Sequence, residues 1–151
     1  MHSHDLDTVI DKIKDHFNNR ELNYFFDEEL RVFQFGIGTK KYLVVPKDHC
    51  VTVYLILPLQ NNKKCDKIQE FLSRANYGLT LGNFEYDIRD GEIRYKISFL
   101  LPIDLDSVFE NDLIFDSISI CSLMCDRYCK GLSNIIFKDM PAEQAVKMCE
   151  E

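Results

Sequence analysis

Residues 82–99 read Gly-Asn-Phe-Glu-Tyr-Asp-Ile-Arg-Asp-Gly-Glu-Ile-Arg-Tyr-Lys-Ile-Ser-Phe, and this stretch decides the fold class. Apolar and polar residues alternate on both sides of Asp90-Gly91, a dipeptide that is typical of a two-residue type I′ hairpin turn. The apolar pairs expected from this turn are Ile88 with Ile93, Tyr86 with Tyr95, and Phe84 with Ile97. The sequence therefore predicts an antiparallel hairpin with one apolar face.

The other face of this hairpin carries charges of opposite sign. In the same register the charged pairs are Asp87 with Arg94, Glu85 with Lys96 and, nearest the turn, Arg89 with Glu92. Directly opposed pairs of this kind contribute roughly 0.2 to 1 kcal/mol each. A slip by one residue would exchange the two faces, so we expect the register to be strongly specified.

The part of the chain before the hairpin predicts a helix, a group of strands and a second helix. Apolar residues recur at helical spacing at Leu6, Val9, Ile10, Ile13 and Phe17, and again at Ile68, Phe71, Leu72 and Ala75 before a stop at Asn76-Tyr77-Gly78. Residues 22–59 are rich in aromatic and β-branched types and predict three or four antiparallel strands. The strand at 51–57 is apolar on one face and also carries Tyr54 and Ile56, so we expect it to be central and covered on both sides.

A long third helix is expected from about Ser107. Its apolar stripe alternates steps of four and three through Ile114, Ile118, Cys121, Cys125, Tyr128, Leu132 and Ile135. Phe115, Met124 and Ile136 widen the stripe, which favours packing against a sheet over a coiled coil. Gly131 is expected to end or bend this helix. Asp139-Met140-Pro141-Ala142-Glu143 then predicts the start of a brief helix that runs toward Cys149.

These elements predict one α+β domain that spans residues 1–151. Helices pack on an antiparallel sheet in the order α-β-β-β-α-β-β-α, followed by a short C-terminal helix. The length fits one domain, and the sequence contains neither an internal repeat nor a linker that would divide it.

Composition and charge narrow the classes of function. A hydrophobic content of 46% is enough to build a core, which excludes a disordered chain. Eighteen Lys and Arg against 25 Asp and Glu give a net charge of -7, which repels phosphate backbones and anionic lipids, so we expect neither nucleic acid nor a membrane as partner. The start of the chain does not resemble a secretion signal, and no apolar stretch could span a bilayer. We therefore expect a cytoplasmic protein with six reduced thiols.

No residue pattern predicts a catalytic, cofactor-binding or metal-binding site, and we do not expect an enzyme. Cys121 and Cys129 would lie about 12 Å apart along a helix, so at most two of Cys121, Cys125 and Cys129 could share an ion. These cysteines are expected to be buried thiols. Structural or solvated roles are expected for the other candidates: His2 and His4, the strand start His49-Cys50, the hairpin turn at 36–41, and the acidic turn Asp27-Glu28-Glu29.

The predicted hairpin and the end of the chain resemble the YbjN family of bacterial proteins. The resemblance rests on Asn76-x2-Leu79-x2-Gly82-x-Phe84-x2-Asp87-x2-Asp90-Gly91-x-Ile93-x-Tyr95 and on Pro141-Ala142-Glu143-Gln144-Ala145-Val146. It implies a fold similar to the class I type III secretion chaperones, which are small acidic proteins that dimerise and bind an extended segment of a partner. Proteins that resemble YbjN are described as regulators of sensory transduction, and the family supplies no catalytic residues. The run Tyr24-Phe25-Phe26 matches no signature of that family.

The leading functional hypothesis is a non-catalytic, protein-binding domain with a chaperone-like or regulatory role, which we expect to be a homodimer. It would hold a segment of a partner protein through its antiparallel sheet and its dimer surface. Two alternatives remain at this stage. One is a small-molecule-sensing domain in which Tyr24, Tyr42, Tyr54, Tyr86 or Tyr95 line a pocket between the sheet and the long helix. The other is a purely structural homodimer.

Overall fold

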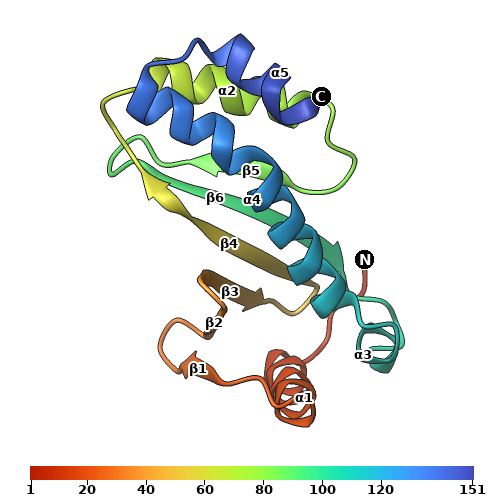
Figure 1. Ribbon diagram of the computed structural model, residues 1–151. Helices are drawn as coiled ribbons and strands as arrows, with labels where there is room; N and C mark the ends of the chain where they lie inside the picture. The colour runs from red at the N-terminus through yellow and green to blue at the C-terminus, as the bar shows by residue number, and fades with distance from the viewer.

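A computed structural model describes all 151 residues as an open, six-stranded antiparallel sheet with five helices (Figure 1). The strands are β1 (Tyr24–Asp27), β2 (Val32–Ile37), β3 (Lys40–Pro46), β4 (Cys50–Gln60), β5 (Asn83–Tyr86) and β6 (Glu92–Leu100). The helices are α1 (Leu6–Asn19), α2 (Cys65–Tyr77), α3 (Asp106–Glu110), α4 (Leu113–Lys138) and α5 (Ala142–Glu150). The predicted α+β class is confirmed, with four strands in the stretch where three or four were expected.

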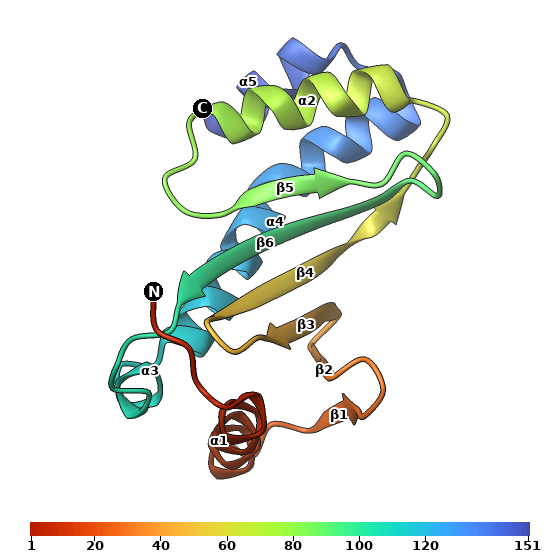
Figure 2. The same ribbon diagram turned by 180° about the vertical axis from the view of Figure 1, so that it is seen from behind.

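The helices lie on one face of the sheet and leave the other face without a helix. The strand order is β1-β2-β3-β4-β6-β5, and every neighbouring pair is antiparallel. Helix α4 crosses this sheet and packs on β4 and β6, whereas α1 lies near β1 to β3, and α2 and α5 lie beyond β5 (Figures 1 and 2). The domain therefore has a helix-covered face and an open face.

A single row of large side chains crosses the helix-covered face of the sheet. The strand registers place one residue from each strand side by side: Tyr24, Phe35, Tyr42, Leu55, Tyr95 and Phe84. The four inner members are buried, and so is Phe84, which meets Tyr95 and Tyr128 edge to face at centroid distances of 4.9 and 5.3 Å. This row joins the two ends of the sheet into one core.

Strand β4 is central, as expected, but the expectation that it is covered on both sides is wrong. Val51, Val53, Leu55 and Leu57 are buried, whereas Thr52, Tyr54 and Ile56 face the open side and are half-buried. The guanidinium of Arg94 on the neighbouring strand lies 4.3 Å from the centre of the Tyr54 ring. Long side chains of adjacent strands shield these apolar residues, because their stems cover apolar surface while their charges stay in water.

The predicted register of the β5–β6 hairpin is wrong by two residues, although its faces are right. The structure pairs Phe84 with Tyr95 and Tyr86 with Ile93, and it leaves Ile88 exposed in the loop. A shift of two residues keeps the same side chains on each face, because the period of a strand is two.

The cause of this shift is a longer loop than the predicted two-residue turn. The N–H of Asp87 donates to Glu92, the N–H of Gly91 donates back to Asp87 (2.7 Å), and the loop holds the four residues from Ile88 to Gly91. A type I′ turn requires positive φ at both central residues, but only Gly91 in this loop has one, at 82°. Asn61 holds the loop at this point: its backbone N–H donates to the Gly91 carbonyl at 3.1 Å, and a Cβ at residue 91 would lie 2.4 Å from its backbone.

The long third helix is divided in two. Helix α3 ends at Glu110, and Asp112, with φ of 57°, separates it from α4. Gly131 neither ends nor bends α4, contrary to expectation. It lies where α4 meets Phe71 of α2 and Ala145 of α5, and a Cβ there would come within 2.9 Å of the Ala145 carbonyl oxygen. The glycine permits close packing of three helices.

The other helix predictions are confirmed. Helix α1 begins after Asp5, whose carboxylate accepts the N–H of Thr8, and its apolar positions are buried. Helix α2 ends at Gly78, and α5 follows Pro141. The predicted apolar stripe of α4 is buried along its length.

The two ends of the sheet are built alike, which the sequence reading did not anticipate. A helix followed by a hairpin forms one end (α1, β1, β2), and the same sequence of elements forms the other (α2, β5, β6). Each hairpin has a four-residue loop that directly follows an aspartate. Arg31 N–H donates to the carbonyl of Asp27 as Gly91 N–H donates to Asp87, and both Arg31 and Gly91 have positive φ. The two hairpins can therefore be compared position by position.

Candidate protein-interaction surface

The outer edge of β1 is an open strand edge. Arg31 N–H donates to the carbonyl of Asp27, so the backbone groups of Asp27 point toward β2 and the loop. Because backbone groups alternate along an antiparallel strand, those of Tyr24 and Phe26 point away from β2. No strand pairs with them there, and no hydrogen bond joins them to another part of the chain. These two residues present unpaired donors and acceptors to an incoming strand.

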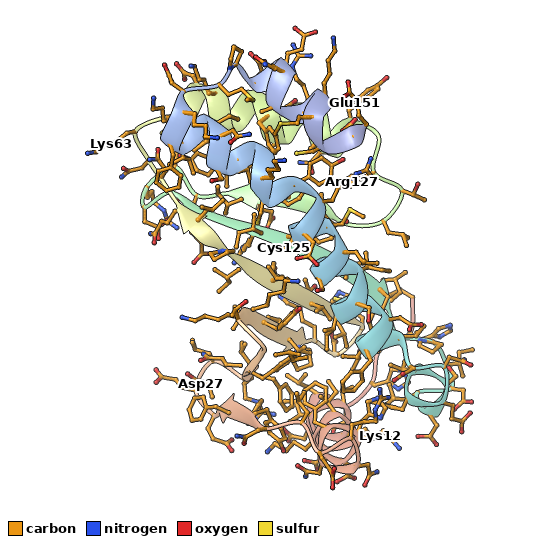
Figure 3. All side chains as sticks on the ribbon, viewed as in Figure 1. Lys12, Asp27, Lys63, Cys125, Arg127 and Glu151 are labelled. Atoms are coloured by element: carbon orange, nitrogen blue, oxygen red, sulfur yellow. The ribbon has the colours of Figure 1, made fainter.

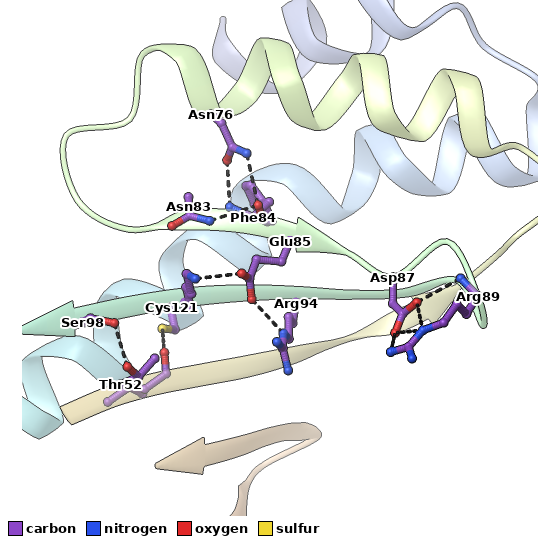
Figure 4. A network of polar contacts seen from close by, with 12 residues as sticks. Thr52, Asn76, Asn83, Phe84, Glu85, Asp87, Arg89, Arg94, Ser98 and Cys121 are labelled. Carbon is purple, nitrogen blue, oxygen red and sulfur yellow. Dashed lines mark hydrogen bonds and ion pairs between the residues drawn. The ribbon is translucent and has the colours of Figure 1, made fainter. Parts of the chain in front are cut away.

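A side chain closes the outer edge of β5 at Phe84. Asn76, at the end of α2, accepts the N–H of Phe84 at 2.7 Å and donates its amide N–H to the carbonyl of Phe84 at 3.1 Å (Figure 4). Asn83 donates a further hydrogen bond to the same carbonyl at 3.2 Å. The carboxamide thus substitutes for one peptide of a neighbouring strand. Phe84 corresponds in position to Tyr24, which has no such partner.

The open face of the sheet changes in character from the β5 end to the β1 end. One row across it contains Phe25, Gln34, Leu43, Tyr54, Lys96 and Asn83. Near β5, Glu85 accepts Arg94 Nε at 2.9 Å and Lys96 Nζ at 2.7 Å, which forms a charged cover over the strands. Near β1 the row ends at Phe25, whose side chain is 62% exposed. The apolar end of the open face therefore meets the open edge.

We call the β1 surface the outward backbone of Tyr24 and Phe26 together with the exposed side chain of Phe25. The acidic residues Asp27-Glu28-Glu29, where the sequence predicted a solvated turn, border this surface. The Asp27 carboxylate accepts the N–H groups of Glu29 and Leu30, and Glu28 lies 3.9 Å from Lys14, whereas Glu29 has no ion-pair partner. The turn gives the β1 surface a negative border.

Ion pairs lower the pKa values of two carboxylates in the hairpin formed by β5 and β6. Burial raises the pKa of Glu85, but hydrogen bonds from Lys96 and Arg94 outweigh it and bring that pKa below its ordinary value of 4.5. Hydrogen bonds from the side chain and backbone of Arg89 lower the pKa of Asp87 to about 2. A hollow of about 540 Å³ lies beside this loop, lined mostly by charged side chains that are already paired with one another. It offers no convergent set of free polar groups.

The tyrosines considered as pocket-lining residues do not come together. Tyr42 and Tyr95 are buried in the core, Tyr24 faces α1, and Tyr54 lies on the open face. Tyr86 donates to the carbonyl of Asn61 at 2.6 Å and also contacts Cys65. The interior between the sheet and α4 is filled by the packed residues of the core.

The remaining residues singled out in the sequence lie apart from one another. His49 contacts Asp48 at 2.5 Å rather than Cys50, and His4 contacts the carbonyl of Pro102 at 2.8 Å. Gly38 and Thr39 form the two-residue turn between β2 and β3, which confirms the hairpin expected there. Among the cysteines, Cys121 and Cys125 are buried, and Cys125 contacts Cys129. No group of three or more His, Cys, Asp or Glu side chains is placed to hold a metal ion.

Comparison of the chain with models of known protein families, with curated proteins and with solved structures finds no match. None of the helices has the length and apolarity needed to cross a bilayer.

Sequence reasoning missed the two features that define the surface. The aromatic run Tyr24-Phe25-Phe26 is evident in the sequence, but nothing in it reveals that its strand lies at the edge of the sheet. Asn76 was interpreted only as part of a helix stop, although its side chain bonds to a strand eight residues later. A polar residue at a helix end followed by a short strand is a signal that could have suggested such a contact.

Proposed function

We propose that this chain is a non-catalytic, protein-binding domain with a chaperone-like or regulatory role, which holds an extended segment of another protein against β1. The observation that carries the proposal is the difference between the two edges of the sheet. Asn76 pairs the outward groups of Phe84 on the β5 edge, whereas the outward groups of Tyr24, at the equivalent position of β1, and of Phe26 are unpaired. Addition of a strand would satisfy these groups with main-chain hydrogen bonds.

The surroundings of the edge define the chemistry of the segment. Phe25 offers an apolar contact on the open face, so alternate residues of the segment should be apolar. The acidic turn beside the edge, with the unpaired Glu29, favours Lys or Arg at the adjoining end. The resemblance of residues 76–95 to the YbjN family supports the same class of function.

The first test uses short linear peptides displayed on phage and selected on the immobilised chain. We expect the selected peptides to alternate apolar and polar residues and to carry Lys or Arg. Phe25→Glu should reduce their binding, because it places a charge on the apolar contact and extends the negative border. Glu85→Gln, at the equivalent position of the closed edge, is the matched control and should bind as the unmodified chain does. Equal binding to Phe25→Glu and the unmodified chain would contradict the proposal.

A second test reads the backbone directly. Hydrogen exchange of the amides of Tyr24 and Phe26 should slow when a selected peptide binds, because these N–H groups then donate to the added strand. Protection confined to α2 and α5 would place the binding surface elsewhere. Protection that rises with the concentration of the chain alone, together with a doubled mass in solution, would show that a second copy occupies the edge.

A further inference from the structure

Two cysteines on α4 form a sulfur pair. The Sγ atoms of Cys125 and Cys129 lie 3.3 Å apart, one helical turn from each other. Cys125, labelled near the middle of α4 in Figure 3, is 3% exposed and faces the sheet. Cys129 is half-buried, so a reagent can reach the pair from its side. The nearest hydrogen-bonding contacts of Cys65, Cys121 and Cys149 are with oxygen atoms or a tyrosine, not with sulfur.

A lysine from the sheet stands beside this pair. Lys40 Nζ donates to Ser122 Oγ at 2.8 Å and contacts Asp126 Oδ1 at 2.7 Å, and both partners lie on α4 next to Cys125. The hydrogen bond with the Cys129 thiol lowers the pKa of Cys125; burial opposes this shift, and the Lys40 charge supports it. The same hydrogen bond raises the pKa of Cys129. Cys125 is therefore the sulfur that loses its proton first, beside a neighbour that keeps one.

The separation of the two sulfur atoms distinguishes between the reactions open to a thiol pair. A disulfide requires Cβ atoms about 3.5 to 4.5 Å apart, whereas residues four apart on a helix have Cβ atoms about 5 to 6 Å apart. Closing the bond would thus distort α4 where it packs on the sheet. A tetrahedral zinc ion requires two further ligands, and no group of three suitable side chains exists.

A single bridging atom fits without movement of the helix. With metal–sulfur bonds of about 2.3 Å, two sulfur atoms 3.3 Å apart subtend an angle of about 90° at the shared atom. That angle belongs to a pyramidal, three-coordinate centre that carries one further substituent. We propose that Cys125 and Cys129 form a dithiol binding site for trivalent, thiol-seeking metalloids of the arsenite class.

The binding reaction balances without an oxidant. With phenylarsine oxide as the probe, the Cys125 thiolate adds across the arsenic–oxygen bond and forms one As–S bond, and the oxygen takes up a proton from water in place of the one that Cys125 released. The Cys129 thiol then displaces the resulting hydroxyl group and forms the second As–S bond. The hydroxyl group leaves as water with the Cys129 proton, and arsenic remains trivalent throughout.

The test measures the mass of the reduced, full-length chain after treatment with phenylarsine oxide. We expect one phenylarsenic group per chain that survives an excess of a monothiol and is removed by a small dithiol. Cys125→Ala and Cys129→Ala should each make the adduct labile to the monothiol, whereas Cys149→Ala should keep it. Lys40→Met should slow the formation of the adduct about tenfold, because it removes the cation beside the thiolate.

A measurement on the unmodified chain keeps the proposal falsifiable if a variant fails to fold. Peptide mapping after alkylation should show that phenylarsine oxide protects Cys125 and Cys129 and leaves Cys50 and Cys65 open to the alkylating reagent. Protection of any other pair, or an adduct that a monothiol removes from the unmodified chain, would overturn the proposal.

Discussion

The two hairpins at the ends of the sheet share one backbone plan and differ in how their outer strands are finished. Both loops follow an aspartate and end with a residue of positive φ, Arg31 in one and Gly91 in the other. At the β5 end the carboxamide of Asn76 bonds to the outward N–H and carbonyl of Phe84, and charged residues cover the open face. At the β1 end the peptide groups are free. The same backbone arrangement can therefore have either a protected strand edge or an edge that is open to pairing. The difference lies in the side chains.

The largest effect on stability is expected from a substitution in the loop between β5 and β6. Gly91→Ala should destabilise the chain by about 3 kcal/mol, because a Cβ collides with the backbone of Asn61 and the residue must keep a positive φ. Urea unfolding measures the change. Arg31→Gly, at the equivalent position, is the control. It should shift the free energy of unfolding by less than about 1 kcal/mol, since glycine relieves the positive φ while the ion pair with Asp7 is lost. If both variants lose the same free energy of unfolding, the two loops do not differ in how tightly their backbones are constrained.

The next prediction opens the protected edge. Asn76→Ala should cost about 2 kcal/mol, because it leaves the peptide groups of Phe84 without their partner in a partly buried site. It should also promote self-association, which light scattering measures, since the chain then has two free edges. Asn18→Ala, near the end of α1, removes no side-chain hydrogen bond to β1 and should leave both properties unchanged. A monomeric, fully stable Asn76→Ala variant would show that the carboxamide does not protect the edge.

A smaller effect follows from the ion pairs on the open face. Because the pKa of Glu85 in the folded chain is below its ordinary value of 4.5, its ionised form stabilises the fold above that pH. This contribution is lost as the pH falls through the lower, folded pKa. Glu85→Gln should therefore reduce stability by about 1 kcal/mol at neutral pH, after allowance for partial exposure. The difference from the unmodified chain should vanish in acid. A difference independent of pH in unfolding experiments would rule out this ionic contribution.

The smallest expected change in stability concerns the exposed residue of the open edge. Phe25→Glu makes the β1 end resemble the β5 end, where Glu85 occupies the equivalent position. The free energy of unfolding should change by less than about 0.5 kcal/mol, because the phenyl ring is largely exposed. If the Phe25→Glu variant loses peptide binding, this loss could then not be attributed to unfolding. A large drop in melting temperature would instead assign Phe25 a structural role.

Alternation and helical spacing predicted the fold class and the buried faces because these patterns depend on neighbouring residues. Ile93 and Tyr95 face the core as expected, and the apolar stripe of α4 is buried throughout. The hairpin register failed because a residue far along the chain, Asn61, fixes the loop at Gly91. Local turn preference contains no information about that contact.

The candidate surface was less predictable than the fold. The edge position of Tyr24 depends on the order of all six strands, and local periodicity does not predict strand order. Likewise, Tyr54 and Ile56 look like residues of a doubly covered strand, yet Arg94 supplies the cover from the next strand. The sequence does predict that Cys125 and Cys129 are neighbours, because residues four apart share a helix face. Spacing alone does not give the distance between their sulfur atoms.

The position of α4 in the chain has a consequence for synthesis. This helix covers β4 and β6, but its residues follow every strand in the sequence. While the chain emerges from the ribosome, Val53, Leu55 and Ile97 therefore remain without their covering helix until α4 has left the exit tunnel. Folding of the sheet should be delayed until α4 has been synthesised, and the nascent sheet should be the stage most prone to aggregation.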